Sequence, residues 1–185
     1  MGRRRPRPTR SMKPVFLVLC EGQTEATYLE FLKQTFRSPI KIVSNVTGTC
    51  ITKALLNKKV QETKLTPYEH IKVFVMYDLD VDTISQKIDE CDCCKLLSNP
   101  CIEVWYLFHS SDSAKSLSAK QCINALKQSA SVWMNYQKNI LTDTQRRFLR
   151  ENYKKAIATA KRLNVGSNPS STVYLLLEEL EKSVR

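Results

Sequence analysis

The feature that most limits the fold of this chain is a set of three short apolar runs with helical patterns between them. The runs occupy residues 14–20, 40–46 and 71–77, and the first reads PVFLVLC. Short runs rich in β-branched and aromatic residues are typical of strands. The intervening segments, 24–36 and 50–64, carry apolar residues at helical spacing. Strand, helix, strand, helix, strand is the order of an α/β unit with parallel pairing.

The second half of the chain is mostly helical in pattern. IEVWYLFH, residues 102–109, predicts a fourth strand, and helices are expected at about 117–138, 142–162 and 171–184. We therefore expect an α/β fold with a central, mostly parallel sheet flanked by helices and a helical C-terminal region. It would form one domain over 13–185, with the α/β core at about 14–110 and the helical part at about 115–185.

Basic residues dominate the charge of the chain, which has 29 Lys and Arg against 18 Asp and Glu. Residues 1–12 contain prolines and no acid, and they predict a flexible basic arm; its arginines are Arg3, Arg4, Arg5, Arg7 and Arg10. With Lys13 these make six of the basic residues, so 23 basic residues still face 18 acidic ones in the rest of the chain. Such a balance favours nucleic acid as partner, with the arm contacting phosphates.

The seven cysteines are an odd number, which is typical of reduced thiols in a cytoplasmic protein. Cys91, Cys93 and Cys94 lie close together, but zinc sites space a ligand pair by two or more residues and need a second pair. No apolar run approaches the roughly 20 residues of a membrane span. We therefore expect a cytoplasmic location and no membrane contact.

The third run leads directly into YDLDVD, which places Asp78, Asp80 and Asp82 at alternating positions. Alternate side chains of an extended chain face the same way, so three carboxylates would converge. Like charges resist this unless a cation lies among them, and oxygen ligands suit Mg²⁺ or Mn²⁺. Sites in open α/β sheets lie beyond the carboxyl ends of strands, where this motif stands. The alternative is a solvated acidic turn.

Two further motifs carry ionisable groups. CEGQTE follows the first run, and its Glu21 could complete a metal site or move a proton, or could simply stabilise a helix start. Glu25, one turn later, is either part of the site or an exposed helix residue. In NPCIEVWYLFH, Glu103 is a charge within an apolar run, which is edge-exposed or functional. His109 is a base, a phosphate contact or a structural histidine.

Together these motifs resemble the TOPRIM fold and, within it, the RloB family. TOPRIM domains carry a glutamate after the first strand and DxD after the third. RloB-like proteins add a CEG and TE start, an NP-x-x-E-x-W segment and a late NPS-T stretch. In this chain the four motifs read CEGQTE (20–25), YDLDVD (77–82), NPCIEVW (99–105) and NPSST (168–172). The chain departs from many relatives at Ile102, where an aromatic residue is common, and at Leu79, where a basic one is common.

The resemblance implies a Rossmann-like TOPRIM core with a metal-dependent nuclease site. It also implies a part in antiviral defence, including abortive infection, beside an ABC-type or AAA-type ATPase. By this analogy Glu21 transfers a proton and Asp78 and Asp80 bind metal, whereas the resemblance assigns no role to Glu25, Asp82 or Glu103.

We therefore expect a nuclease that uses Mg²⁺ or Mn²⁺ to hydrolyse DNA or RNA. The candidate catalytic residues are Glu21, Glu25, Glu103 and His109, and the candidate metal ligands are Asp78, Asp80 and Asp82. The chain is too short for a topoisomerase gate and lacks the partner domain of a primase. The alternative is a non-catalytic nucleic-acid-binding or regulatory subunit whose carboxylates are structural.

Overall fold

A computed structural model describes residues 13–36, 40–43, 51–65, 69–79, 87–112 and 115–184. The basic arm of residues 1–12, with its five arginines, lies outside the described residues, as do Asp80 and Asp82. In chain order the elements are β1 (Lys13–Cys20), α1 (Gln23–Phe36), β2 (Ile40–Val43), α2 (Lys53–Glu62), β3 (Glu69–Asp78), β4 (Cys94–Asn99), α4 (Glu103–Phe108), α5 (Ala119–Ser129), the 3-10 helix η1 (Ser131–Trp133), α6 (Asp143–Lys161), β5 (Ser170–Ser171) and α7 (Tyr174–Val184).

The strands form one sheet in the order β2-β1-β3-β4-β5. β1 pairs in parallel with both β2 and β3, and β3 pairs in parallel with β4. The short β5 closes the edge in the antiparallel direction. The expected α/β fold with a mostly parallel sheet and a helical C-terminal region is confirmed.

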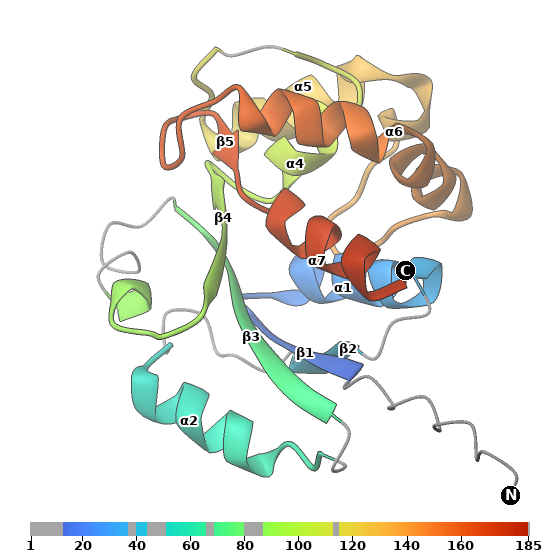
Figure 1. The fold of residues 1–185 in the computed structure, drawn as a ribbon. Coiled ribbons are helices and arrows are strands. Elements are labelled where there is room, and N and C mark those ends of the chain that lie inside the picture. Colours follow the sequence, from blue (N-terminus) through green and yellow to red (C-terminus); the bar gives the residue numbers. More distant parts are fainter. Residues whose placement is uncertain are drawn as a thin grey trace, which may run out of the picture.

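The two faces of the sheet are covered by different helices, because alternate residues of a strand point to opposite faces. On one face, Phe16 and Val18 of β1 pack in a large apolar core with α1, α4, α5, α6 and α7. On the other face, Leu17 and Leu19 pack with Leu56 of α2 in a smaller core. Figure 1 shows α2 on one side of the sheet and α1 and α7 on the other.

The expected strand at 102–109 is wrong, because these residues form the short helix α4. Every side chain of α4 is buried, from Glu103 to Phe108. A helix that is apolar on all sides lacks the one-sided pattern that identifies a surface helix, and a short apolar run then reads equally well as a strand. The fourth parallel strand is instead β4, which comes just before and reads CKLLSN.

Two other boundaries differ from those expected. The helix expected at 117–138 ends with α5 at Ser129, and a 3-10 turn and a loop follow it. The helix expected at 171–184 begins only at Tyr174, because Ser170 and Ser171 pair with β4 as β5. In both cases long-range packing overrides a local helical pattern.

Within the part of the chain that the structure describes, no helix has the length and apolar character needed to span a bilayer.

Candidate functional site

The order of the strands places the candidate site. From β1 the chain moves to β2 on one side and then returns to β3 on the other, so the direction of winding reverses between β1 and β3. In doubly wound sheets the crevice outside the carboxyl ends of such a strand pair is the usual ligand site. Glu21 directly follows β1, and Asp78 is the last residue of β3.

Backbone hydrogen bonds fix the two strand ends beside each other. The N–H of Glu21 donates to the carbonyl of Met76 at 3.1 Å, which continues the β1–β3 ladder by one residue. The N–H of Asp78 donates to Glu21 Oε2, also at 3.1 Å. The N–H of Leu79 donates to the carbonyl of Ser98 on β4 at 2.8 Å. Both side chains, Glu21 and Asp78, are half-buried at this edge of the sheet.

The turn after β1 folds the Glu25 carboxylate back over its own backbone. The N–H of Gly22 donates to Glu25 Oε2 at 3.1 Å. A Cβ atom at position 22 would lie only 3.2 Å from that oxygen, so the glycine permits the close approach. Glu25 is only 6% exposed. Burial raises its pKa above the usual value of 4.5, and the nearby carboxylates of Glu21 and Glu103 raise it further.

A fourth carboxylate reaches the site from the first residue of α4. Glu103 is fully buried, and its Oε1 accepts a hydrogen bond from the hydroxyl of Tyr136 at 3.0 Å. Its Oε2 is buried and has no hydrogen-bond partner among the described residues. The thiol of Cys101 is also close enough to the Glu103 carboxylate to hydrogen-bond with it.

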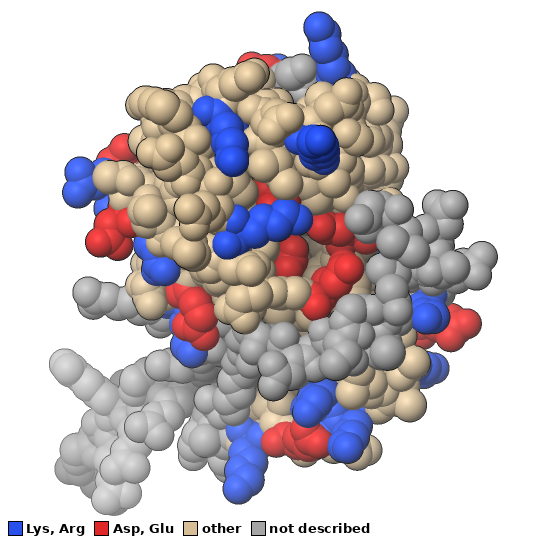
Figure 2. All heavy atoms as spheres, turned by 180° about the vertical axis from the view of Figure 1, so that it is seen from behind, with Lys and Arg blue, Asp and Glu red and all other residues tan. Residues whose placement is uncertain are grey.

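Lys138 brings a positive charge to Glu103. Its Nζ lies 3.8 Å from Glu103 Oε1, and its side chain is about half exposed. Burial alone would lower the pKa of Lys138. The charge of Glu103 acts in the opposite direction, as do more distant groups that include Asp78 and Glu25. Together they outweigh burial, so the pKa of Lys138 is raised. Glu21, Glu25, Asp78 and Glu103, together with Lys138, are called the acid cluster below. The space-filling view from behind shows Asp and Glu side chains gathered near the centre of one face, beside basic ones (Figure 2).

The two Asn-Pro motifs meet at the sheet edge and support the start of α4. Asn99 of β4 pairs with Ser170 of β5, and Ser98 pairs with Ser171. The hydroxyl of Thr172 donates to the carbonyl of Lys95 at 2.9 Å and accepts from the N–H of Leu97 at 2.7 Å. NPSST therefore holds the strand that leads into Glu103.

The contacts of His109 do not include the acid cluster. Its Nδ1 lies 2.8 Å from the carbonyl of Trp105, and its ring packs edge-on against Trp105, 5.1 Å between centroids. Burial lowers the pKa of His109 to about 4, so the ring is neutral at pH 7. Its Nε2 has no hydrogen-bond partner within the described part of the chain. The geometry favours the structural interpretation of His109.

Sequence reasoning missed Lys138 and Tyr136, which lie beside the Glu103 carboxylate. Both follow the η1 turn, more than thirty residues after Glu103 along the chain, in a segment expected to be helical. An isolated Lys or Tyr in such a pattern gives no local signal, because only the tertiary fold brings it to a buried carboxylate.

The carboxylates of the acid cluster are chemically suited to bind a divalent cation. Their oxygens are the hard ligands that Mg²⁺ and Mn²⁺ prefer. Among the residues that the structure describes, no three acidic, His or Cys side chains stand together as a ready metal site. Asp78 and Glu21 are the described candidates, and Asp80 and Asp82 would have to complete the set. The six described cysteines, which include Cys91, Cys93 and Cys94, are free thiols.

Comparison with known proteins gives one match. The family model described as RloB-like protein matches residues 16–180, which contain every member of the acid cluster. Neither the curated proteins nor the solved structures gave a match. Because the family model covers nearly the whole length, the chain belongs to the RloB-like protein family.

Proposed function

We propose that this protein is a metal-dependent nuclease that hydrolyses phosphodiester bonds in DNA or RNA. The observation that carries the proposal is the meeting of Glu21 and Asp78 at the point where the winding of a parallel sheet reverses, with the buried carboxylates of Glu25 and Glu103 nearby. A group of like charges is unfavourable unless it serves a ligand or shares protons. The region matched by the RloB-like family model includes all four of these carboxylates.

The residues would divide the chemistry according to their surroundings. Asp78, with Asp80 and Asp82 next to it in sequence, would hold Mg²⁺, which neutralises charge on the phosphoryl oxygens when bound. Glu21 would accept a proton from the attacking water as the new P–O bond forms. Glu25, whose pKa is raised by burial, would hold a proton and pass it to the oxygen that leaves as the old P–O bond breaks.

Cleavage of labelled DNA and RNA strands by wild-type protein and matched variants tests the proposal. We expect activity with Mg²⁺ or Mn²⁺ that disappears with EDTA, and a loss of about 10²-fold or more in Asp78→Asn and Glu21→Gln. Glu151→Gln is the control, because Glu151 is an exposed acid on α6 outside the acid cluster. Full activity in Asp78→Asn, or no activity in the wild type with either metal, would refute the nuclease.

A second function is favoured by one observation. The carboxylates of Glu21 and Glu25 accept hydrogen bonds from the backbone N–H groups of Asp78 and Gly22, as purely structural acids would. The protein would then be a nucleic-acid-binding or regulatory subunit without catalysis. In that case Glu21→Gln would lower stability, and the wild type would bind strands without cutting them.

The proposed biological setting is antiviral defence with an ABC-type or AAA-type ATPase as partner. This part of the proposal rests on the resemblance to the RloB family alone. Co-purification with an ATPase encoded beside this protein would test it, and a neighbourhood without such an ATPase would contradict it.

A further inference from the structure

An arginine-lined groove lies between α1 and α6. α1 is also the helix that begins at the acid cluster. The groove has a volume of about 410 Å³, and its lining includes Arg146, Arg147 and Arg150 of α6. The lining is completed by Phe31, Gln34 and Thr35 of α1 and by Asp143 of α6. Its basic side chains outnumber its single acidic one by three to one.

The spacing of the arginines places them on one face of α6. Residues 143, 146, 147 and 150 stand at helix positions i, i+3, i+4 and i+7, which brings their side chains to one side of a helix. Arg147 and Arg150 are exposed, and neither takes part in an ion pair with another described residue. Asp143 lies in the first turn of α6, where the helix dipole favours a carboxylate.

Arg146 is held in place and still has donors to spare. Its Nε donates to the carbonyl of Leu141 at 3.0 Å, and its Nη1 donates to Gln34 Oε1 at 2.9 Å. A guanidinium carries five N–H groups, so further donors remain for a ligand. A guanidinium that is already oriented loses little freedom when it binds an anion.

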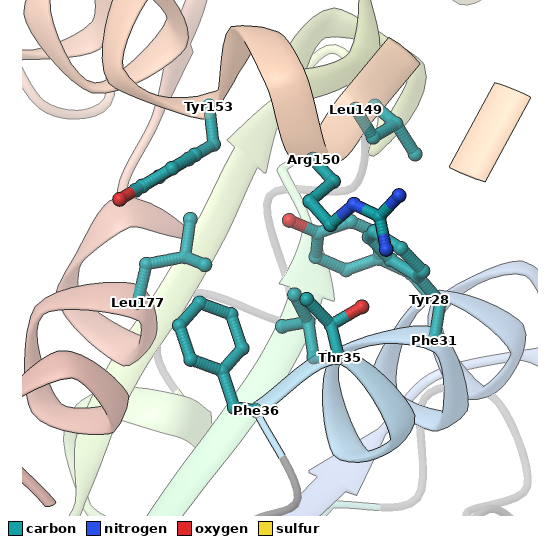
Figure 3. Close-up of a pocket in the computed structure, with 9 residues that line it drawn as sticks. Tyr28, Phe31, Thr35, Phe36, Leu149, Arg150, Tyr153 and Leu177 are labelled. Atoms are coloured by element: carbon teal, nitrogen blue, oxygen red, sulfur yellow. The ribbon is translucent and has the colours of Figure 1, made fainter. Parts of the chain in front are cut away.

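The groove adjoins an apolar pocket. A charged group is not expected to enter that pocket, so the anionic part of a ligand should lie on the side of the arginines. Figure 3 shows this pocket between α1, α6 and α7, with Arg150 projecting from α6. Its volume is about 150 Å³, and it is lined mainly by aromatic and aliphatic side chains such as Phe36 and Leu177. Arg150, Phe31 and Thr35 line both hollows, so the anionic part of a ligand belongs on the arginine side.

α1 connects this groove with the acid cluster. Gln34 lies nine positions after Glu25, which corresponds to about 14 Å along a helix. Successive bases along one strand of a B-form duplex are about 3.4 Å apart, so this span covers about four nucleotides. A strand whose scissile phosphate lies at the acid cluster would therefore reach the arginines a few nucleotides away.

We propose that the groove formed by Gln34, Arg146, Arg147 and Arg150 binds the phosphate backbone of a nucleic-acid strand beside the acid cluster. The inference rests on the proposed function for the identity of the strand as substrate. Guanidinium groups in a fixed arrangement favour phosphate oxygens, which they contact through paired N–H groups. The site is distinct from the basic arm of residues 1–12.

The test measures binding without cleavage, in EDTA, by fluorescence anisotropy of labelled single strands of DNA and of RNA over a range of salt. We expect the double variant Arg147→Gln, Arg150→Gln to bind several-fold more weakly. Its plot of log affinity against log salt should be flatter by about 1.4, because each phosphate contact with a single strand contributes about 0.7. Arg147→Lys, Arg150→Lys keeps the charge and should retain most of the wild-type slope.

Lys53→Gln, Lys58→Gln is the matched control, because both lysines are exposed on α2, over the opposite face of the sheet, and the change in net charge is the same. Equal slopes for this control and the arginine variant would overturn the inference, as would wild-type protein that binds neither strand. A labelled polyglutamate peptide that depends on Arg147 and Arg150, when the strands do not, would assign the groove to an acidic protein and also overturn it.

The test separates this inference from the proposed nuclease. Binding that depends on the groove, in a wild type that fails to cleave with Mg²⁺ or Mn²⁺, would uphold the groove and remove the nuclease. If the wild type cleaves strands but binding does not depend on the groove arginines, the nuclease would be upheld and the groove proposal would be rejected.

Discussion

At the scale of single residues, the acid cluster is an excess of negative charge held at the end of a sheet. The ammonium group of Lys138 lies 3.8 Å from Glu103 Oε1, and it is about half exposed and therefore screened by water. Repulsion between the carboxylates can be relieved in two ways: by a proton shared among the acids, or by a bound cation. Burial is the main cause of the raised pKa of Glu25, and the charges of Glu21 and Glu103 add to it.

The raised pKa of Glu25 should make the stability of the folded protein depend on pH. Its pKa in the folded protein lies above the usual 4.5, so the folded state binds the proton more tightly than the unfolded state does. Stability from this group is present below about pH 4.5 and is lost as the pH rises through the raised pKa. Glu25→Gln removes this loss and keeps an oxygen that can accept the Gly22 hydrogen bond.

We therefore expect Glu25→Gln to melt about 2–4 °C above the wild type at neutral pH, which corresponds to about 1 kcal/mol for a domain of this size. The difference should vanish near pH 4. Melting curves at the two pH values, with Glu151→Gln as control, check this. A variant that melts below the wild type at neutral pH would show that the Glu25 charge stabilises the fold.

At the scale of elements, the loop between η1 and α6 brings Lys138 to the acid cluster by bonding to α1. The hydroxyl of Thr24 donates to Asn139 Oδ1 at 2.9 Å, and the hydroxyl of Thr27 donates to the carbonyl of Asn139 at 3.1 Å. Asn139 has a φ of 68°, in the left-handed region that Asn tolerates better than most residues. The residue next to Lys138 is thus fixed by both its side chain and its backbone.

Asn139→Ala should lower the free energy of unfolding by about 1–3 kcal/mol, because it loses the bond from Thr24 and strains the left-handed position. Asn139→Gly loses the same bond without the strain, so it should cost less. Urea unfolding of the two variants measures the difference. If alanine and glycine were equally tolerated, the left-handed backbone would contribute nothing to the position of Lys138.

The elements that sequence reasoning predicted are those with a one-sided or bounded pattern. β1 is an apolar run that ends just before Glu21, and β3 is one that ends at Asp78, so the meeting of these two acids at one sheet edge could be anticipated. The segment 102–109 could not be placed, because a helix buried on all sides has no periodic signal. β4 was missed because only Leu96 and Ser98 are buried in a polar and cysteine-containing stretch.

At the scale of the whole molecule, the doubly wound sheet places acids and bases at different ends of one helix. α1 starts beside Glu21 and Glu25 and ends beside the arginine groove. The net charge of +11 attracts a polyanion, whereas the acid cluster is a local exception within that field. The proposed phosphodiester substrate would match this combination, because its backbone would contact the arginines and a cation held by the acids would neutralise charge on its scissile phosphate.

The central claim is that the acid cluster binds a divalent cation, and a titration of Mn²⁺ followed by the EPR signal of the free ion tests it most directly. We expect the wild type and the Glu151→Gln control to remove Mn²⁺ from solution equally, Mg²⁺ to compete for the same site, and Asp78→Asn to bind at least about tenfold more weakly. A wild type that leaves all Mn²⁺ free, or an Asp78→Asn variant that binds as the wild type does, would contradict the account.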